Sequence, residues 1–279
     1  MDGIISIIKP PGLSSHDVVS WARKQLNTRK IGHSGTLDPG AAGILVLGVG
    51  KGTKLLEYIQ STKKTYRAEI ILGFETDTGD MFGEKIDSKE VNLLSQNEWD
   101  SVLSSFVGDK KQLPPMTSAL KKDGVPLYKL ARSGKDIERE LRNISIFDIT
   151  LVDIYQNKIL FDVTCSKGTY IRVLCQDIAR LCNNVGTMSF LLRTAVGPFN
   201  IENSNTMNES VDLLPLNLAI EHLYQVELNE EQVIDIKHGR LVHTNLSDKD
   251  IVALIDSKES LIAIAYIKNG YIHPRKVFI

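Results

Sequence analysis

The chain has 279 residues, of which 42% are hydrophobic and 24% charged, which is typical of a folded globular protein and excludes a disordered one. No run of about 18 apolar residues occurs, so we expect no membrane span. The first residues lack the basic and then apolar pattern of a secretory signal, so we expect a cytoplasmic protein. Because the length exceeds that of an average domain, we expect one larger domain with a small appendage.

The net charge of −1 argues against general binding of nucleic acid, but the charges are unevenly distributed. Residues 1–67 contain ten Lys or Arg against four acids, and residues 110–142 contain nine against four. Such segregation suits a surface that holds a polyanion. Charge alone favours the simpler reading of a solvated basic face.

The predicted elements alternate between strands and helices. Apolar runs rich in β-branched residues predict strands over Ile4–Ile8, Tyr66–Leu72 and Ile159–Thr164. Apolar residues at helical spacing predict two helices, through Val19, Ala22 and Leu26 and through Ile171, Leu174, Ile178 and Leu181. An approximate capping box of Ser14 and Asp17 starts the first helix. Because the spacing is not that of regular βαβ units, a mixed α/β sheet is predicted rather than a doubly wound one.

Two changes of composition divide the chain. The stretch Lys110–Arg142 is dense in charge and interrupted by Pro and Gly, so we predict a mobile insertion that carries some helix. A second change falls at Leu213–Glu221, beyond which Val226–Ile279 alternates short apolar runs with turn signals. We therefore predict a main domain over 1–220 and a small β-rich domain over 221–279.

The three cysteines, Cys165, Cys175 and Cys182, have no C-x-x-C spacing and no accompanying histidine pattern. An odd number in a long chain favours neither a disulfide framework nor a zinc site. We expect no metal and no disulfide.

The segment Gly32–Gly43 is the sharpest local motif. Four glycines and a proline in twelve residues exclude a plain helix or a central strand and predict a tight loop that a ligand approaches closely. The loop presents one carboxylate, Asp38, followed by Pro39. Asp-Pro is also a common turn signal, and without further context that structural reading is the stronger one.

Seven segments together change this balance, because in this order they resemble the motifs of the TruB family of pseudouridine synthases. They cover most of the first 200 or so residues and are Gly3–Ser15, Gly32–Gly43, Lys63–Arg67, Thr76–Gly83, Gln112–Gly134, Gly168–Arg172 and Leu192–Phe199. The resemblance implies an α+β fold, with a mixed, largely antiparallel sheet in the catalytic domain and a C-terminal domain similar to a PUA domain. It implies isomerisation of the T-loop uridine at position 55 of tRNA to pseudouridine.

The resemblance also assigns the catalytic residues. Asp38 is the catalytic carboxylate, able to attack C1′ or C6 of the nucleotide or to stabilise positive charge on the sugar. Arg172 is expected to orient Asp38 and to hold its pKa down. Tyr66 is expected to stack on the uracil and to take or relay a proton.

Substrate-binding roles follow from the same resemblance. His33 would brace the space vacated by the flipped base, and Leu192 would form an apolar wall of the uracil pocket. The remaining residues that we expect to bind substrate are Gly35 and Thr36 in the loop and the phosphate-binding Lys63, Lys64, Lys121 and Arg132. Thr117 stands where relatives commonly carry tyrosine, a departure that we expect to affect RNA affinity and not the catalytic residues.

The expected partner is the T-arm stem-loop of tRNA, held by an insertion that orders on the substrate. We expect no organic cofactor, no membrane association and no obligate protein partner, and a monomer. The C-terminal domain, whose likeness to the family is less specific, would dock on RNA outside the active site.

The residues leave three alternative functions open. Gly48–Lys54 has the glycine content of a nucleotide-phosphate loop but matches neither the P-loop nor the dinucleotide fingerprint. A non-catalytic RNA-binding or RNA-folding protein could use the same scaffold, although retention of Asp38, Tyr66 and Arg172 argues against it. A synthase that depends on a guide-RNA complex is the third alternative, against which the insertion argues.

Overall fold

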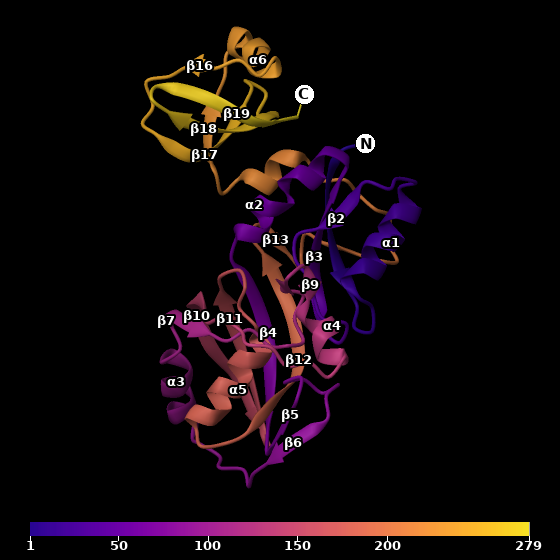
Figure 1. Cartoon of the computed structure of the whole chain (residues 1–279), viewed down its shortest axis with the longest axis vertical. Helices are drawn as coiled ribbons and strands as arrows, with labels where there is room; N and C mark the ends of the chain where they lie inside the picture. Colours follow the sequence, from indigo (N-terminus) through magenta and orange to yellow (C-terminus); the bar gives the residue numbers. More distant parts are fainter. Residues whose placement is uncertain (279) are drawn as a thin grey trace.

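The computed structural model describes residues 1–278, except for the side chain of Arg132, which lies outside the described part. In this part of the chain the strands form two larger sheets and two short hairpins. Figure 1 shows the two sheets as separate bodies along the long axis of the molecule, with both termini near the junction. The α+β fold that the sequence predicted is confirmed.

The large sheet has ten strands in the described residues, in the order β14-β1-β3-β12-β4-β11-β10-β7, with β2 on β3 and β13 on β12. Most pairs are antiparallel; β1–β14 and β3–β12 are parallel. The mixed, largely antiparallel sheet is thus as expected. Its strands are β1 (Gly3–Lys9), β2 (Ile31–His33), β3 (Ala42–Val49), β4 (Lys64–Leu72), β7 (Gly108–Gln112), β10 (Arg142–Tyr155), β11 (Lys158–Cys165), β12 (Gly186–Val196), β13 (Phe199–Asn200) and β14 (Asn205–Thr206).

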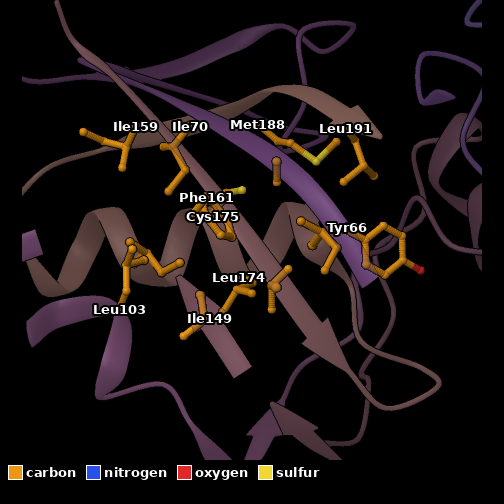
Figure 2. Packing of buried hydrophobic residues seen from close by; sticks show 14 of the residues in the cluster. Tyr66, Ile70, Leu103, Ile149, Ile159, Phe161, Leu174, Cys175, Met188 and Leu191 are labelled. Carbon is orange, nitrogen blue, oxygen red and sulfur yellow. The ribbon is translucent and has the colours of Figure 1, made fainter. Parts of the chain in front are cut away.

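Helices cover this sheet and explain its hydrophobic pattern. β11 alternates buried and half-buried residues, as a strand with one covered face must. The buried side chains of α5 pack with those of α3 and of the β4–β11–β10 region into one core (Figure 2). A second core lies between α1 and strands β1 to β3. The helices of this domain are α1 (Ser15–Gln25), α2 (Leu56–Ser61), α3 (Gln96–Ser104), α4 (Leu127–Arg132) and α5 (Ile171–Leu181), with the 3₁₀ turns η1 (Gly50–Leu55) and η2 (Leu216–Ile220).

The predicted capping box is present at the start of α1. The Ser14 hydroxyl accepts from the Asp17 N–H at 3.2 Å, and the Asp17 carboxylate accepts from the Ser14 N–H at 2.8 Å. Two orphan N–H groups of the first turn are thereby satisfied. Leu26, which the helical spacing included, is the C-cap residue just beyond α1.

The insertion contains little regular structure. A short hairpin of β8 (Lys121–Lys122) and β9 (Val125–Pro126) leads directly into α4. The helix predicted inside this stretch is therefore present, but it is only six residues long. A separate hairpin of β5 (Phe74–Thr76) and β6 (Lys85–Ser88) follows β4.

The C-terminal sheet has five strands among the described residues, in the order β15-β17-β18-β19-β16. It has a core of its own and one covering helix. Its elements are β15 (Tyr224–Glu227), α6 (Glu230–Lys237), β16 (Val242–His243), β17 (Lys249–Ile255), β18 (Leu261–Lys268) and β19 (Tyr271–Val277).

The glycine-rich stretch Gly48–Lys54 lies at the junction of the two sheets (Figure 1). Lys51 Nζ donates to the Phe278 carbonyl at 2.6 Å, and Lys54 Nζ donates to the Val277 carbonyl at 3.3 Å. The stretch runs from the end of β3 into the 3₁₀ turn η1, which leads into α2. Its lysines fix the end of the C-terminal sheet, so the geometry gives the nucleotide-phosphate alternative no support.

The cysteines are buried and free. Within residues 1–278, no cluster of His, Cys, Asp or Glu has the arrangement of a metal site. None of the helices in that range is long and apolar enough to cross a membrane.

Candidate active site

The Asp38 loop joins β2 to β3 and is held by the first residue of α1 and by the segment that precedes this helix. Ser15 Oγ donates to the Leu37 carbonyl at 3.1 Å and accepts from the Leu37 N–H at 2.8 Å. The Gly12 N–H donates to the Pro39 carbonyl at 2.8 Å. These bonds hold the backbone on both sides of Asp38, so the carboxylate projects from a fixed loop.

Lys9, at the end of β1, stabilises the same loop. Its side chain is fully buried, and Nζ donates to the carbonyls of Pro10 (3.0 Å), Leu13 (2.8 Å) and Pro39 (3.3 Å). Burial lowers the pKa of Lys9 to about 8, and the nearby Asp38 charge opposes that effect. Lys9 thus links the N-terminal strand to the catalytic loop.

Glycine is required where β3 meets β12. Gly43 has φ of 110° and pairs with Arg193 in the parallel β3–β12 ladder. A Cβ at Gly43 would lie 2.6 Å from the Arg193 backbone nitrogen, which is closer than real Cβ atoms approach. Only glycine allows both the positive φ and this contact.

Arg172 binds the candidate catalytic aspartate. Its Nε lies 3.1 Å from Asp38 Oδ2, and its Nη1 lies 3.6 Å from Asp80 Oδ2. Arg172 stands in the first turn of α5, is 5% exposed, and reaches the loop that joins β5 to β6. The sequence predicted the pairing of Arg172 with Asp38, whereas Asp80 lies in the motif Thr76–Gly83 and was given no role of its own.

The remaining donors of Arg172 bind the insertion and the β5–β6 loop. Nη1 donates to the Thr78 carbonyl at 2.9 Å and to Thr117 Oγ1 at 2.6 Å, and Nη2 donates to the Thr117 carbonyl at 3.0 Å. The expectation that Thr117 stays apart from the catalytic residues is therefore wrong. The insertion touches the active-site arginine directly.

The pKa of Asp38 is raised above the ordinary aspartate value. Burial among protein atoms is the largest cause, the Arg172 charge opposes it, and the Asp80 charge adds to it. The expectation that Arg172 holds this pKa down is thus correct for the Arg172 contribution and wrong for the net direction. The side chain still keeps 39% of its surface exposed, so a substrate can reach the carboxylate.

Tyr66 lies on β4 at the edge of the large core. Figure 2 shows its ring against the cluster and its hydroxyl turned away from the other labelled side chains. The residue is 9% exposed, and burial raises the pKa of its phenol. The Arg193 charge lowers that pKa and so opposes burial.

Arg193 is the main site residue that the sequence reasoning missed. It is 3% exposed on β12, and its Nε donates to the Ile44 carbonyl at 2.7 Å and its Nη2 to the Gly35 carbonyl at 3.2 Å. One buried guanidinium therefore connects β3 with the Asp38 loop, and its charge acts on Tyr66. The available signal was an arginine within the mostly apolar run Phe190–Val196.

The other loop residues lie around this centre. His33 ends β2, and both burial and the Arg193 charge lower the pKa of its imidazole. Its Nδ1 is buried and has no hydrogen-bond partner in the part of the chain that is described. Leu192 is half-buried on β12, where it pairs with Ala42 of β3, and Thr36 is exposed.

The predicted phosphate-binding residues differ in their surroundings. Lys63 is exposed, with Nζ 4.2 Å from the centroid of the Phe147 ring, and Lys121 is exposed on β8. Lys64 is only 6% exposed and donates to the carbonyls of Gln60 and Thr62. These carbonyls end α2, so Lys64 caps that helix and is not presented to RNA, contrary to expectation. The side chain of Arg132 lies outside the described residues.

This arrangement combines a reachable carboxylate, a buried guanidinium that binds it and a tyrosine on a neighbouring strand. The carboxylate can act as a nucleophile or stabilise positive charge, and the guanidinium fixes its orientation. The phenol and a neutral imidazole can stack on a planar ring. None of these roles uses a metal or an organic group.

Comparison with known proteins agrees with this chemistry. The model of the N-terminal domain of TruB family pseudouridylate synthases matches residues 23–171. The tRNA pseudouridine synthase B of Alkaliphilus oremlandii (strain OhILAs) is 44% identical over 252 residues, which are 88% of this chain and 84% of that protein. The protein of the same name from Carboxydothermus hydrogenoformans is 38% identical over 284 residues and covers 100% of this chain and 99% of its own.

Solved structures share the fold. The crystal structure of a Cbf5-Nop10-Gar1 complex contains a chain with a TM-score of 0.78 and 26% identity, covering 99% of this chain and 85% of its own. A chain in the structure of an H/ACA RNP bound to a substrate RNA containing 2′-deoxyuridine has a TM-score of 0.77. The family model, the curated relatives and the fold agree: the chain belongs to the TruB family of pseudouridine synthases, which are isomerases.

Proposed function

We propose that this protein converts the T-loop uridine at position 55 of tRNA to pseudouridine, with Asp38 as the catalytic carboxylate. The observation that carries the proposal is the contact between Asp38 and Arg172, in which a reachable carboxylate is bound by an otherwise buried guanidinium. The relatives named tRNA pseudouridine synthase B support tRNA as the substrate.

The reaction breaks the N1–C1′ bond of the uridine, turns the freed uracil, and joins its C5 to C1′. The proton on C5 leaves and N1 gains one, so atoms and electrons balance without an added reagent. Ionised Asp38 attacks carbon or stabilises the positive charge at C1′. Arg172 opposes the effect of burial and so favours the ionised form of Asp38.

Tyr66 and Arg193 would act on the uracil base of the bound uridine. The Tyr66 ring would stack on uracil, and its hydroxyl would take or relay the C5 proton. The Arg193 charge lowers the phenol pKa relative to burial alone, which favours that proton transfer. The half-buried Leu192 would form an apolar wall beside the ring.

The base reaches this site only after it leaves the T-loop stack, which costs a few kcal/mol of unstacking. His33, with an unpaired buried Nδ1, is placed to support the RNA at the catalytic loop. Exposed Lys63 and Lys121 would bind phosphates and position the T-arm without reading bases. The insertion, which already touches Arg172 through Thr117, would close on the bound RNA.

We propose that the chain acts alone, as a monomer, in the cytoplasm. The insertion supports independence from a guide RNA, and the C-terminal sheet would contact RNA outside the active site. A folding activity towards tRNA is compatible with this function and would survive loss of Asp38.

The test incubates purified protein with unmodified tRNA transcript and maps pseudouridine by carbodiimide-dependent primer-extension stops. A stop at position 55 that disappears with Asp38→Asn, while tRNA binding is kept, is the expected result. Tight binding by the wild type without any stop would overturn the stand-alone enzyme and favour the RNA-binding or guide-dependent alternative.

A further inference from the structure

Phe82 is the most exposed large apolar side chain of residues 1–278, with 79% of its surface accessible. It lies in the loop between β5 and β6, next to Met81, which is 49% exposed. Scattered exposed apolar residues are ordinary on protein surfaces. The position of this ring is what distinguishes it.

One edge of the Phe82 ring lies against the catalytic loop. A Cβ built on Gly40 would overlap this edge, with Cζ only 2.8 Å away, and its three nearest atoms all belong to Phe82. Gly40 is two residues beyond Asp38 in the same loop. The ring therefore lies against the loop that carries Asp38, with most of its surface open to solvent.

The loop that carries Phe82 is held by side-chain bonds, with Asp80 at their centre. Asp80 Oδ1 accepts from the Phe82 N–H at 3.1 Å and from Thr78 Oγ1 at 2.7 Å, and Thr76 Oγ1 donates to the Asp80 carbonyl at 2.7 Å. The other oxygen of Asp80 faces Arg172. The residue that binds the active-site arginine thus also fixes the backbone of Phe82.

We infer that Phe82 is a positioning residue whose exposed ring stacks on an unpaired base of the substrate RNA next to the target uridine. This inference rests on the proposed function. An aromatic ring that is fixed and solvent-exposed offers a stacking platform, and every base has a π-face, so the contact places the RNA without reading its sequence. Stacking on one flanking base would help to hold the strand while the target base turns out.

The test compares steady-state kinetics of wild type and Phe82→Ala on a T-arm stem-loop RNA. We expect KM to rise about tenfold, the loss of one base–aromatic stack, with little change in kcat. Phe82→Trp keeps a stacking surface and should stay close to wild type. Ile86→Ala is the matched control, because Ile86 is a 62% exposed side chain on β6 of the same hairpin and should leave KM unchanged.

A double-variant cycle tests the placement itself. As a single change, Gly40→Ala should displace the Phe82 ring and raise KM. Combined with Phe82→Ala, it should have a smaller effect on KM. Binding of a stem-loop carrying 2-aminopurine beside the target uridine, measured with Asp38→Asn to prevent turnover, should quench fluorescence only when the ring at position 82 is present.

The outcomes separate the two proposals. Wild type without activity on tRNA would reject the proposed function. If the wild type is active and Phe82→Ala has an unchanged KM, the stacking role is rejected and the function stays intact. The same holds if Phe82→Ala lowers only kcat and Tm. Equal effects of Gly40→Ala in both backgrounds would reject the contact as its cause.

Discussion

Arg172 binds Asp38 with its Nε 3.1 Å from the carboxylate, and the same guanidinium lies 3.6 Å from Asp80. One buried cation is therefore shared by two acids that face it from different loops. Burial and the Asp80 charge both raise the pKa of Asp38, and the charges of Arg172 and then Lys9 oppose them. The protonation of Asp38 is consequently set by its neighbours, which leads to a signed pH prediction.

We expect activity to fall on the acid side with an apparent pKa above the ordinary aspartate value. Asp80→Asn removes a negative neighbour, so the acid limb should move to lower pH even if kcat falls. Arg172→Met removes the positive neighbour and should move any residual activity to higher pH. Single-turnover rates of pseudouridine formation across pH measure both shifts. If the acid limb moves in the same direction in the two variants, or in the opposite direction to that expected for each, the sharing of Arg172 by the two acids is contradicted.

The same pKa predicts a stability effect. An aspartate whose folded-state pKa is raised binds more protons folded than unfolded, so its contribution to the free energy of unfolding falls as pH rises from the unfolded value through the folded one. Asp38→Asn should abolish that part of the pH dependence. Thermal unfolding of both proteins through the acid range tests this, and identical curves would mean that Asp38 titrates as in the unfolded chain.

Thr117 provides a third prediction. Thr117→Val removes the hydroxyl that accepts from Arg172 at 2.6 Å and leaves a charged donor short of a partner. Because a hydrogen bond to a charged group contributes about 1.5–3 kcal/mol, kcat should fall roughly tenfold or more. Thr117→Ser keeps the hydroxyl and should retain most of the rate. A Val variant with wild-type kcat would show that this contact is irrelevant once RNA is bound.

Local patterns predicted much of the fold. The three strands inferred from β-branched runs lie within β1, β4 and β11, and both predicted helices are present. Their signals are periodicity and capping, which depend on neighbours in the sequence. The short strands β13, β14 and β16 were missed, since two-residue strands are defined by pairing with distant partners and carry no period of their own.

The candidate site shows the same division. Asp38, Tyr66 and Arg172 were predicted as site residues because motif order linked a loop, a strand and a helix that lie far apart in the sequence. Arg193 and Thr117 were missed or misjudged because their importance comes from contacts made across the sheet and the insertion. The sequence alone also does not show that Lys64 is buried and its neighbour Lys63 exposed.

The joint between the two sheets leads to a fourth prediction. One core contains residues of both, including Ile44 and Phe199 from the large sheet and Ile264 with Phe278 from the C-terminal part. Lys276 adds an ion pair with Glu57 of α2. We therefore expect the chain to unfold in a single thermal transition.

Phe278→Ala should disturb that cooperativity. Phe278 is 5% exposed, and truncating a buried phenylalanine costs about 3–5 kcal/mol. We expect a lower first transition, in which the C-terminal sheet melts before the large one, in calorimetry. Ile234→Ala, at a 55% exposed position on α6, is the control and should leave the single transition intact. Two transitions already present in the wild type would refute the shared core as a coupling element.

Adjacent Lys63 and Lys64 give the last prediction, because they carry the same charge in opposite surroundings. Lys63 is exposed beside the Phe147 ring, whereas Lys64 is buried and caps α2 through the Gln60 and Thr62 carbonyls. Lys63→Ala should weaken tRNA binding and reduce the slope of log K against log salt by about 1, the loss of one phosphate contact. Lys64→Met should leave that slope unchanged and lower the Tm instead.

Burial lowers the pKa of Lys64 to about 8, so its contribution to the free energy of unfolding should rise as pH increases from about 8 towards the unfolded lysine value. This pH dependence should disappear in Lys64→Met and persist in Lys63→Ala. A reduced salt slope for Lys64→Met would instead place its ammonium group on the RNA and contradict the capping role.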